Sequence, residues 1–223
     1  MDIVYRCKVY PLDRFLKPHL YTLNWLPELS VDDKRKPVRF LHIVEKSMGL
    51  LDRWKASFLR QLLDQNDPAT VLVIDAISIW SRMLPHKSES QVHYLNNPSI
   101  LQFSGLVGFL AQLCESPDLA LRSRCDIHAS LDAPLKTVIL DNLSAYYFQE
   151  NASLETLRKL LETLHATLGC AVVTFGYGIE YYEGVDNTYP TRPSEIKGPW
   201  PTRLDYSYLK AMDSVLVFTQ DKN

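Results

Sequence analysis

Two runs of apolar residues that each end on an aspartate constrain the fold of this chain most strongly. Residues 71–75 read VLVID and residues 138–141 read VILD. A continuous apolar run of this length is typical of a parallel strand that is buried on both faces. Such a strand carries its final carboxylate to the carboxyl edge of the sheet, where α/β proteins bind ligands. The pattern predicts an α/β fold with acidic groups at that edge.

From Arg39 onward, strand-like and helix-like patterns alternate along the chain. This alternation is typical of βαβ units, and it predicts three layers, with helices on both faces of a mostly parallel sheet. We expect strands over residues 39–45, 71–79, 137–142, 170–175 and 214–219. The segments at 83–98 and 176–203 are expected to be loops, the second because of its four prolines.

Three helices are expected between these strands. In the first, Leu51, Trp54, Phe58 and Leu62 share one face. A second begins after Asn151 or Ser153 as N-cap and ends at Gly169, and its leucines form one stripe. A third covers residues 100–115, and it is apolar all round. We therefore expect it to be buried against the sheet or in an interface.

The chain is long enough for one large α/β unit, which we place at residues 39–223. Residues 1–38 interleave prolines with apolar residues and are predicted to form an arm that packs on the body or on a partner. The formal net charge of −2 means that the field of the whole protein does not attract nucleic acid. No long apolar segment points to a membrane, and the four cysteines lack the spacing of a zinc site.

The glycine loop that binds phosphate in nucleotide-hydrolysing α/β proteins is missing from this chain. The loop would follow the strand expected at residues 39–45. There, only Lys46 and Ser47 match the motif, at its last two positions, and Glu45 would repel a phosphate. One hypothesis is an NTPase with a degenerate loop that uses Lys46, Ser47 and Asp141. The other interpretation is that Asp75 and Asp141 cap turns or a helix start.

Five segments in collinear order resemble a known family. They are VYPL at residues 9–12, FLHIVE at 40–45, VLVIDAISIW at 71–80, VILDNLS at 138–144 and YLKAMD at 208–213. Together they are similar to the platinum-sensitivity subunit family of the yeast Shu complex, which are diverged paralogues of the eukaryotic RecA-like recombinase. The resemblance covers nearly the whole chain. It implies a RecA-like core, related to P-loop NTPases, without the Walker A loop.

The resemblance also implies a role for single positions. Residues 71–79 resemble the strand that carries the catalytic glutamate of recombinases, and Ile77 occupies the place of that glutamate. Residues 138–144 resemble the Walker B strand, with Asp141 kept. The resemblance thus implies a retained scaffold that is not an enzyme and has no cofactor and no metal.

Recombinases bind DNA through two loops, which fall here at about residues 146–152 and 176–203. In the resemblance, the basic candidates for DNA contact are Arg192, Lys197, Arg203 and Lys210. Tyr189 and Trp200 offer stacking surfaces beside them, although for Trp200 we favour an apolar hinge. Acidic residues outnumber the basic ones in this segment, which predicts weak, salt-sensitive and sequence-independent binding by the isolated chain.

The function implied is a non-catalytic DNA-binding subunit of a recombination mediator (Shu) complex. It would promote or stabilise recombinase filament assembly in homologous recombination and error-free post-replication repair, in the nucleus. The resemblance implies a heterodimer with the other RecA-like subunit, which is the chromosome-segregation-in-meiosis subunit. Further implied partners are the remaining Shu subunits including the SWIM-domain one, the recombinase filament and DNA. A protein scaffold without DNA contact stays open as an alternative.

Overall fold

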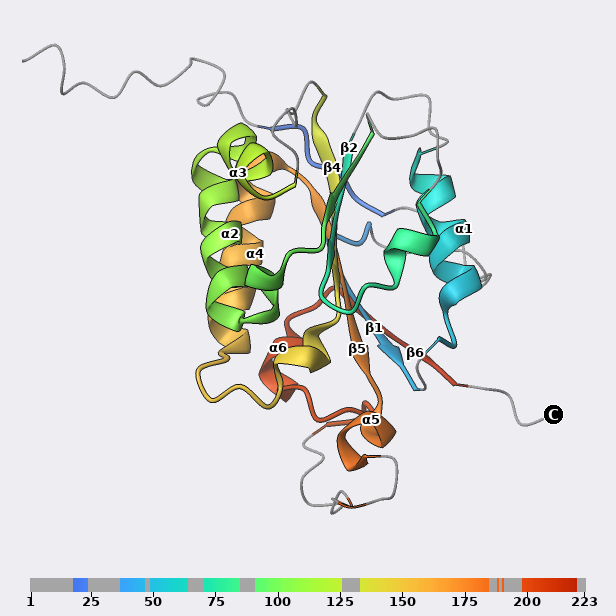
Figure 1. Ribbon diagram of the computed structural model, residues 1–223. Helices are drawn as coiled ribbons and strands as arrows, with labels where there is room; N and C mark the ends of the chain where they lie inside the picture. The colour runs from blue at the N-terminus through green and yellow to red at the C-terminus, as the bar shows by residue number, and fades with distance from the viewer. Residues whose placement is uncertain are drawn as a thin grey trace, which may run out of the picture.

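The computed structural model describes residues 18–23, 37–46, 49–63, 70–84, 91–125, 133–184, 188, 190 and 198–219 of the chain. In this part of the chain a central sheet lies between helices on its two faces (Figure 1). The fold class predicted from the alternating pattern, a three-layer α/β fold, is therefore confirmed.

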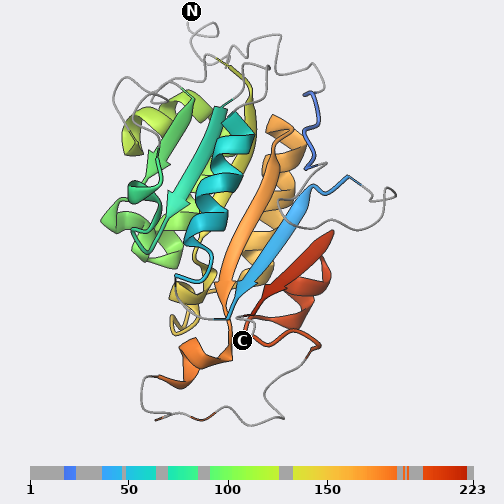
Figure 2. The same ribbon diagram turned by 90° about the vertical axis from the view of Figure 1, so that its right-hand side faces the viewer.

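The described sheet has six strands, all parallel, in the order β3-β2-β4-β5-β1-β6 (Figure 2). The strands are β1 Phe40–Glu45, β2 Thr70–Asp75, β3 Val92–Leu95, β4 Leu135–Asp141, β5 Ala171–Tyr177 and β6 Ser214–Phe218. Every residue of β1, β2, β4 and β5 is buried, because these strands lie inside the sheet and helices cover both faces. This is the mostly parallel sheet, with helices on both faces, that the alternating pattern predicts.

Two hydrophobic cores form, one on each face of the sheet. Helix α1, Asp52–Leu63, packs on one face and buries Trp54, Phe58 and Leu62, as the spacing predicts. Helices α2 (Phe103–Glu115), α3 (Pro117–Arg124), α4 (Leu154–Leu168) and α6 (Tyr206–Lys210) lie on the other face (Figure 1). None of the helices in the described residues combines the length and the apolar character needed to cross a bilayer.

Helix α4 has the predicted ends. The Ser153 hydroxyl accepts a hydrogen bond from the Thr156 N–H at its start, and Gly169 has a φ of 74° just after its last residue. A Cβ at Gly169 would also lie 2.0 Å from the carbonyl oxygen of His19. Glycine is therefore required here for both its conformation and its lack of a side chain.

The chain before β1 contacts the body where it is described. The Tyr21 N–H donates to the Gly169 carbonyl at 2.7 Å, and Leu23 pairs with Val38 in an antiparallel bridge. The side chains of Tyr21 and Leu23 are buried. These contacts add a short antiparallel element to residues that the sequence pattern left irregular.

Several predicted boundaries are wrong. Strand β2 ends at Asp75 and not at residue 79, because the Asp75 carboxylate accepts the N–H of Ile77 and so closes a turn. The expected loop at 83–98 contains β3, an edge strand in which only alternate residues are buried. The expected loop at 176–203 begins with the end of β5 and a short helix, α5, Ile179–Glu183. Short elements with few apolar residues escape a search for periodicity.

Helix α2 begins at Phe103, after a 3₁₀ turn over Pro98–Leu101, and not at residue 100. Its residues Leu106, Leu110 and Leu113 are fully buried, and they belong to the core that α4 shares. The expectation that this helix is buried is confirmed. Its own domain covers these residues, so α2 leaves no large apolar face that a partner would have to cover.

Candidate functional site

Three acidic residues stand at the carboxyl edge of the sheet. Glu45 ends β1, Asp75 ends β2 and Asp141 ends β4. Asp75 and Asp141 lie opposite each other in the register of β2 and β4. This edge is the usual ligand-binding edge of a parallel α/β sheet, so its side chains decide what the fold can do.

A lysine from helix α1 occupies the centre of this edge. The ammonium nitrogen of Lys55 lies 2.7 Å from a carboxylate oxygen of Asp141 and 3.1 Å from one of Glu45. All three side chains are fully buried. The same ammonium lies 4.7 Å from the ring centroid of Phe175, which adds a cation–π contact. We call Glu45, Lys55 and Asp141 the buried triad.

The second oxygen of Glu45 accepts the backbone N–H of Leu51, at 3.1 Å, immediately before α1 begins. In P-loop proteins the N–H groups at the start of the first helix bind the phosphates of the nucleotide. Here the carboxylate of Glu45 takes that anionic position. A phosphate would have to displace a buried carboxylate from both an N–H group and a lysine.

Asp75 and Asp141 are joined by a tryptophan. The backbone N–H of Trp80 donates to Asp75 and its indole N–H donates to Asp141, both at 2.8 Å. The hydroxyl of Tyr94 also donates to Asp75, at 2.9 Å. The predicted capping role of Asp75 is therefore confirmed.

The predicted capping role of Asp141 is wrong. Its carboxylate is directed to Lys55 and Trp80, and the neighbouring Asn142 caps the following 3₁₀ turn by accepting the N–H of Ser144 at 2.8 Å. Both contacts go to one carboxylate oxygen of Asp141, Oδ2, whereas Oδ1 is buried without a hydrogen-bond partner among the described residues. The local capping role falls to the neighbouring amide.

Burial and charge oppose each other in the buried triad. Burial raises the pKa of Asp141, and the ammonium of Lys55 offsets only part of that effect. Burial lowers the pKa of Lys55, but the charges of Asp141 and Glu45 outweigh it, so this pKa is raised. One buried ammonium shared by two buried carboxylates presents no face to solvent on which a water molecule could be activated.

The residues proposed for a degenerate phosphate loop do not meet at this site. The side chain of Lys46 is 45% exposed, and its ammonium lies 3.5 Å from a carboxylate oxygen of Glu180. Ser47 lies outside the described residues. Ile77 follows β2 in the turn closed by Asp75, at the position where the resemblance places a glutamate. The lysine that reaches Asp141 is Lys55 and not Lys46.

Sequence reasoning missed Lys55 and Trp80. One signal for Lys55 was present, because it lies four residues after Leu51 and four before Leu59, within the apolar stripe of α1. A lysine in such a stripe indicates either that this position is not buried or that the lysine is buried beside an acidic residue. Trp80 gave no such signal, since its two bonds depend on how the chain turns after β2.

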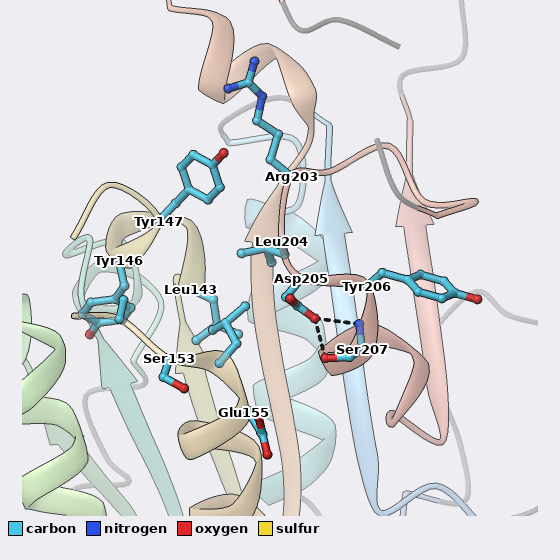
Figure 3. Close-up of a pocket in the computed structure, with 12 residues that line it drawn as sticks. Leu143, Tyr146, Tyr147, Ser153, Glu155, Arg203, Leu204, Asp205, Tyr206 and Ser207 are labelled. Carbon is cyan, nitrogen blue, oxygen red and sulfur yellow. Dashed lines mark hydrogen bonds between the residues drawn. The ribbon is translucent and has the colours of Figure 1, made fainter. Parts of the chain in front are cut away.

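A pocket of about 810 Å³ opens near the end of β4, between the two predicted DNA loops (Figure 3). Leu143, Tyr146, Tyr147 and residues 152–155 line one side, and residues 203–207 line the other. Of the four predicted DNA contacts, only Arg203 lines this pocket, and it is half-buried. Lys210 is exposed at the end of α6, whereas Arg192 and Lys197 lie outside the described residues.

Of the two aromatic residues predicted beside the basic ones, the structure describes Trp200 and not Tyr189. The half-buried ring of Trp200 lies 5.8 Å from the ring of Tyr206 and packs against the core on the α4 face. These contacts show that the ring packs against apolar neighbours, and the apolar hinge that we favoured for Trp200 stays a prediction.

The fold and the buried triad define a three-layer, parallel α/β module in which the chain's own side chains occupy the phosphate position of the strand edge. A family model described as Shu complex component Psy3, DNA-binding, matches residues 7–221, so the chain belongs to that family.

The chain is similar to Platinum sensitivity protein 3 of Saccharomyces cerevisiae. The two are 29% identical over 233 residues, which cover 97% of this chain and 92% of that protein. Among solved structures, it is similar to the cytoplasmic domain of EssC, with a TM-score of 0.39 and 16% identity over 81% of this chain and 32% of that chain. It is also similar to the pCW3 conjugation coupling protein TcpA, with a TM-score of 0.32 and 18% identity over 63% of this chain and 43% of that chain. The chain spans less than half of either solved chain, and these two likenesses carry no argument about function.

Proposed function

We propose that this chain is a non-catalytic DNA-binding subunit of a recombination mediator complex of the Shu type. In this role it promotes or stabilises assembly of the recombinase filament in homologous recombination and error-free post-replication repair, in the nucleus. The observation that carries the proposal is the buried triad, because Glu45 and Lys55 fill the place of a nucleotide's phosphates with an internal ion pair. The description of the family as DNA-binding supports the second half of the proposal.

The proposed partners are the other RecA-like subunit, as a heterodimer, the remaining Shu subunits including the SWIM-domain one, and the recombinase filament. Membership of a Shu complex family supports partners of this kind. The apolar residues of α2 give no support for a partner, because their own domain buries them. A pairing surface must therefore be sought elsewhere on the chain.

We propose that DNA is contacted through phosphates by Arg192, Lys197, Arg203 and Lys210, without sequence preference. The net charge of −2 limits the affinity of the chain alone, so the complex with its RecA-like partner is the appropriate sample. The proposal thus places DNA binding on a surface shared by two subunits.

Replacing Arg192 and Lys197 with alanine together is expected to weaken binding of duplex DNA by the partner-bound complex. Two lost phosphate contacts should reduce the slope of log affinity against log salt by about 2. Fluorescence anisotropy of labelled DNA over a salt series measures both quantities. The matched control is the pair Arg53→Ala and Arg60→Ala, two exposed arginines of α1 on the opposite face from the pocket.

The control pair removes the same charge and should leave affinity and slope close to those of the unaltered complex. Unchanged affinity and slope in the Arg192 and Lys197 pair would refute DNA contact by this loop. That result would favour the alternative of a protein scaffold.

The alternative of a degenerate NTPase is tested by calorimetry with Mg-ATP. We expect no binding heat at micromolar protein, because phosphates cannot reach the start of α1 while Glu45 and Lys55 are paired there. Micromolar affinity for Mg-ATP would contradict the proposal. It would revive a role for Lys46 and Asp141 in phosphate binding.

A further inference from the structure

Strand β6 has the sequence of an interior strand, yet it lies at an edge of the described sheet. Residues 215–218 read VLVF, a continuous apolar run like those of the buried strands β2 and β4. Within the described residues β6 pairs with β1 alone. The side chain of Val217 is 37% exposed, and the rest of the strand is only half-buried. An apolar strand at the edge of a sheet is a place where a further strand adds.

The backbone groups of β6 leave one side of the strand available for pairing. The Phe218 carbonyl accepts the N–H of Lys46 at 3.1 Å, so it is directed toward β1. Successive residues of a strand direct their N–H and C=O groups to opposite sides, so those of Val217 point away from β1. Val215 packs against the core on the α4 face and Leu216 against the core on the α1 face. A strand added here would therefore extend both faces of the sheet.

The N-terminal segment has the composition of an edge strand. Residues 3–10 read IVYRCKVY and are rich in β-branched and aromatic residues, which favour strands. In a strand, one face would carry the apolar residues Ile3, Tyr5, Cys7 and Val9. The opposite face would carry Arg6 and Lys8, and charged side chains of this kind protect edge strands from further pairing. The segment lies outside the described residues, and its pattern is that of the outermost strand of a sheet.

The described chain begins close to this edge of the sheet. Tyr21 bonds to the carbonyl of Gly169, just before β5, and Leu23 pairs with Val38, just before β1. Residues 18–23 therefore lie at the amino edge of the sheet, near the strand that β6 pairs with (Figure 2). The position beyond β6 is two strand spacings, about 10 Å, from β1. Residues 10–17 can span about 26 Å when extended, so the N-terminal segment reaches that position.

We propose that residues 3–9 pair with the outer side of β6 as an antiparallel strand of the same chain. The antiparallel direction follows from the anchor, because residue 9 then ends at the amino edge, near residues 18–23. A parallel strand would end at the carboxyl edge, and residues 10–17 would have to return along the whole strand. The added strand covers Val217 and closes this edge against other molecules. The N-terminal segment is thereby assigned to its own domain.

Thiol crosslinking tests the placement, because Cys7 lies within the proposed strand. In the Val217→Cys variant of the full chain, a short bis-maleimide should join Cys7 to the new thiol, since opposite and diagonal side chains of paired strands lie within about 8 Å. Mass spectrometry of the digested protein identifies the joined peptides. The matched control is Val92→Cys, at a half-buried position of β3, the other edge strand. An arm that packs nowhere reaches both edges, so equal crosslinking of the two variants would overturn the proposal.

Hydrogen exchange of the full chain gives a second readout. Tyr5→Pro removes a backbone N–H from the proposed strand and disturbs its pairing. Exchange of the Val217 amide should then become about tenfold faster, as expected for the loss of a backbone hydrogen bond. Tyr10→Pro makes the same chemical change outside residues 3–9 and should leave this amide as slow as in the unaltered chain. The amides of β3 report on the intact fold and should not change in either variant.

Other occupants of the edge would give different results, and each of them would overturn the proposal. A bis-maleimide product that joins two chains would assign β6 to a second copy. Slow exchange of the Val217 amide that appears only when a partner subunit is added would assign the edge to that partner. Identical exchange of this amide in the unaltered chain, Tyr5→Pro and Tyr10→Pro would show that residues 3–9 do not pair with β6.

Discussion

Replacing Lys55 with methionine is expected to lower the free energy of unfolding by about 3–5 kcal/mol. The change leaves the carboxylates of Glu45 and Asp141 fully buried without the ammonium that both contact. A buried carboxylate that loses its partner must either stay charged at high cost or take up a proton, and both routes destabilise the folded state. Urea unfolding followed by circular dichroism measures the effect.

Two variants make this prediction specific. Lys46→Met removes an exposed lysine whose partner Glu180 is also exposed, and it should cost less than about 1 kcal/mol. The triple variant Glu45→Gln, Lys55→Met, Asp141→Asn removes all three charges at once, while its amide oxygens still accept the N–H groups of Leu51 and Trp80.

The triple variant should recover a large part of the stability lost in Lys55→Met, because no uncompensated charge remains. A Lys55→Met protein as stable as the Lys46→Met protein would show that the buried triad does not hold the strand edge together.

The stability of the protein is expected to fall as the pH drops below about 6.5, because His42 cannot take up a proton in the folded state. Its side chain is fully buried in β1, and burial lowers its pKa from 6.5 to about 3. Its Nδ1 lies 2.8 Å from the hydroxyl of Thr174, and its Nε2 has no hydrogen-bond partner among the described residues. Only one of its two ring nitrogens therefore has a hydrogen-bond partner among the described residues.

The direction of the effect follows from the two pKa values. The unfolded chain binds a proton at His42 below pH 6.5, whereas the folded chain does so only near pH 3. The stability that the neutral histidine contributes is fully present above pH 6.5 and is lost as the pH falls toward 3. Between pH 6.5 and about pH 5 this histidine alone should remove roughly 1.5 kcal/mol.

Urea unfolding at these two pH values, compared between the unaltered protein and His42→Leu, isolates the contribution of His42. The variant should lose less stability on acidification, by about the amount given above. His42→Gln, which keeps a hydrogen-bonding group beside Thr174, serves as a second uncharged variant if leucine disturbs the fold. An identical pH dependence in all three proteins would contradict the assignment.

Local patterns predicted the elements whose stability depends on near neighbours. The apolar runs that end at Asp75 and Asp141 form β2 and β4, and the stripe between Ser153 and Gly169 forms α4 with both predicted ends. Each of these elements is specified within a few residues by burial of alternate or continuous apolar side chains and by a cap. The same reasoning failed at β3, where the pattern is four residues long.

The sequence by itself determined the α/β class, the absence of a phosphate-binding glycine loop and the presence of carboxylates at the strand ends. What those carboxylates do was decided only by the tertiary structure. Trp80 bonds to Asp141 across 61 residues, and Lys55 reaches the same carboxylate from a helix on one face of the sheet. Such contacts depend on the order of the strands and on burial, because a buried ammonium is stable only where the fold places carboxylates beside it. That tertiary arrangement is what filled the phosphate position from within.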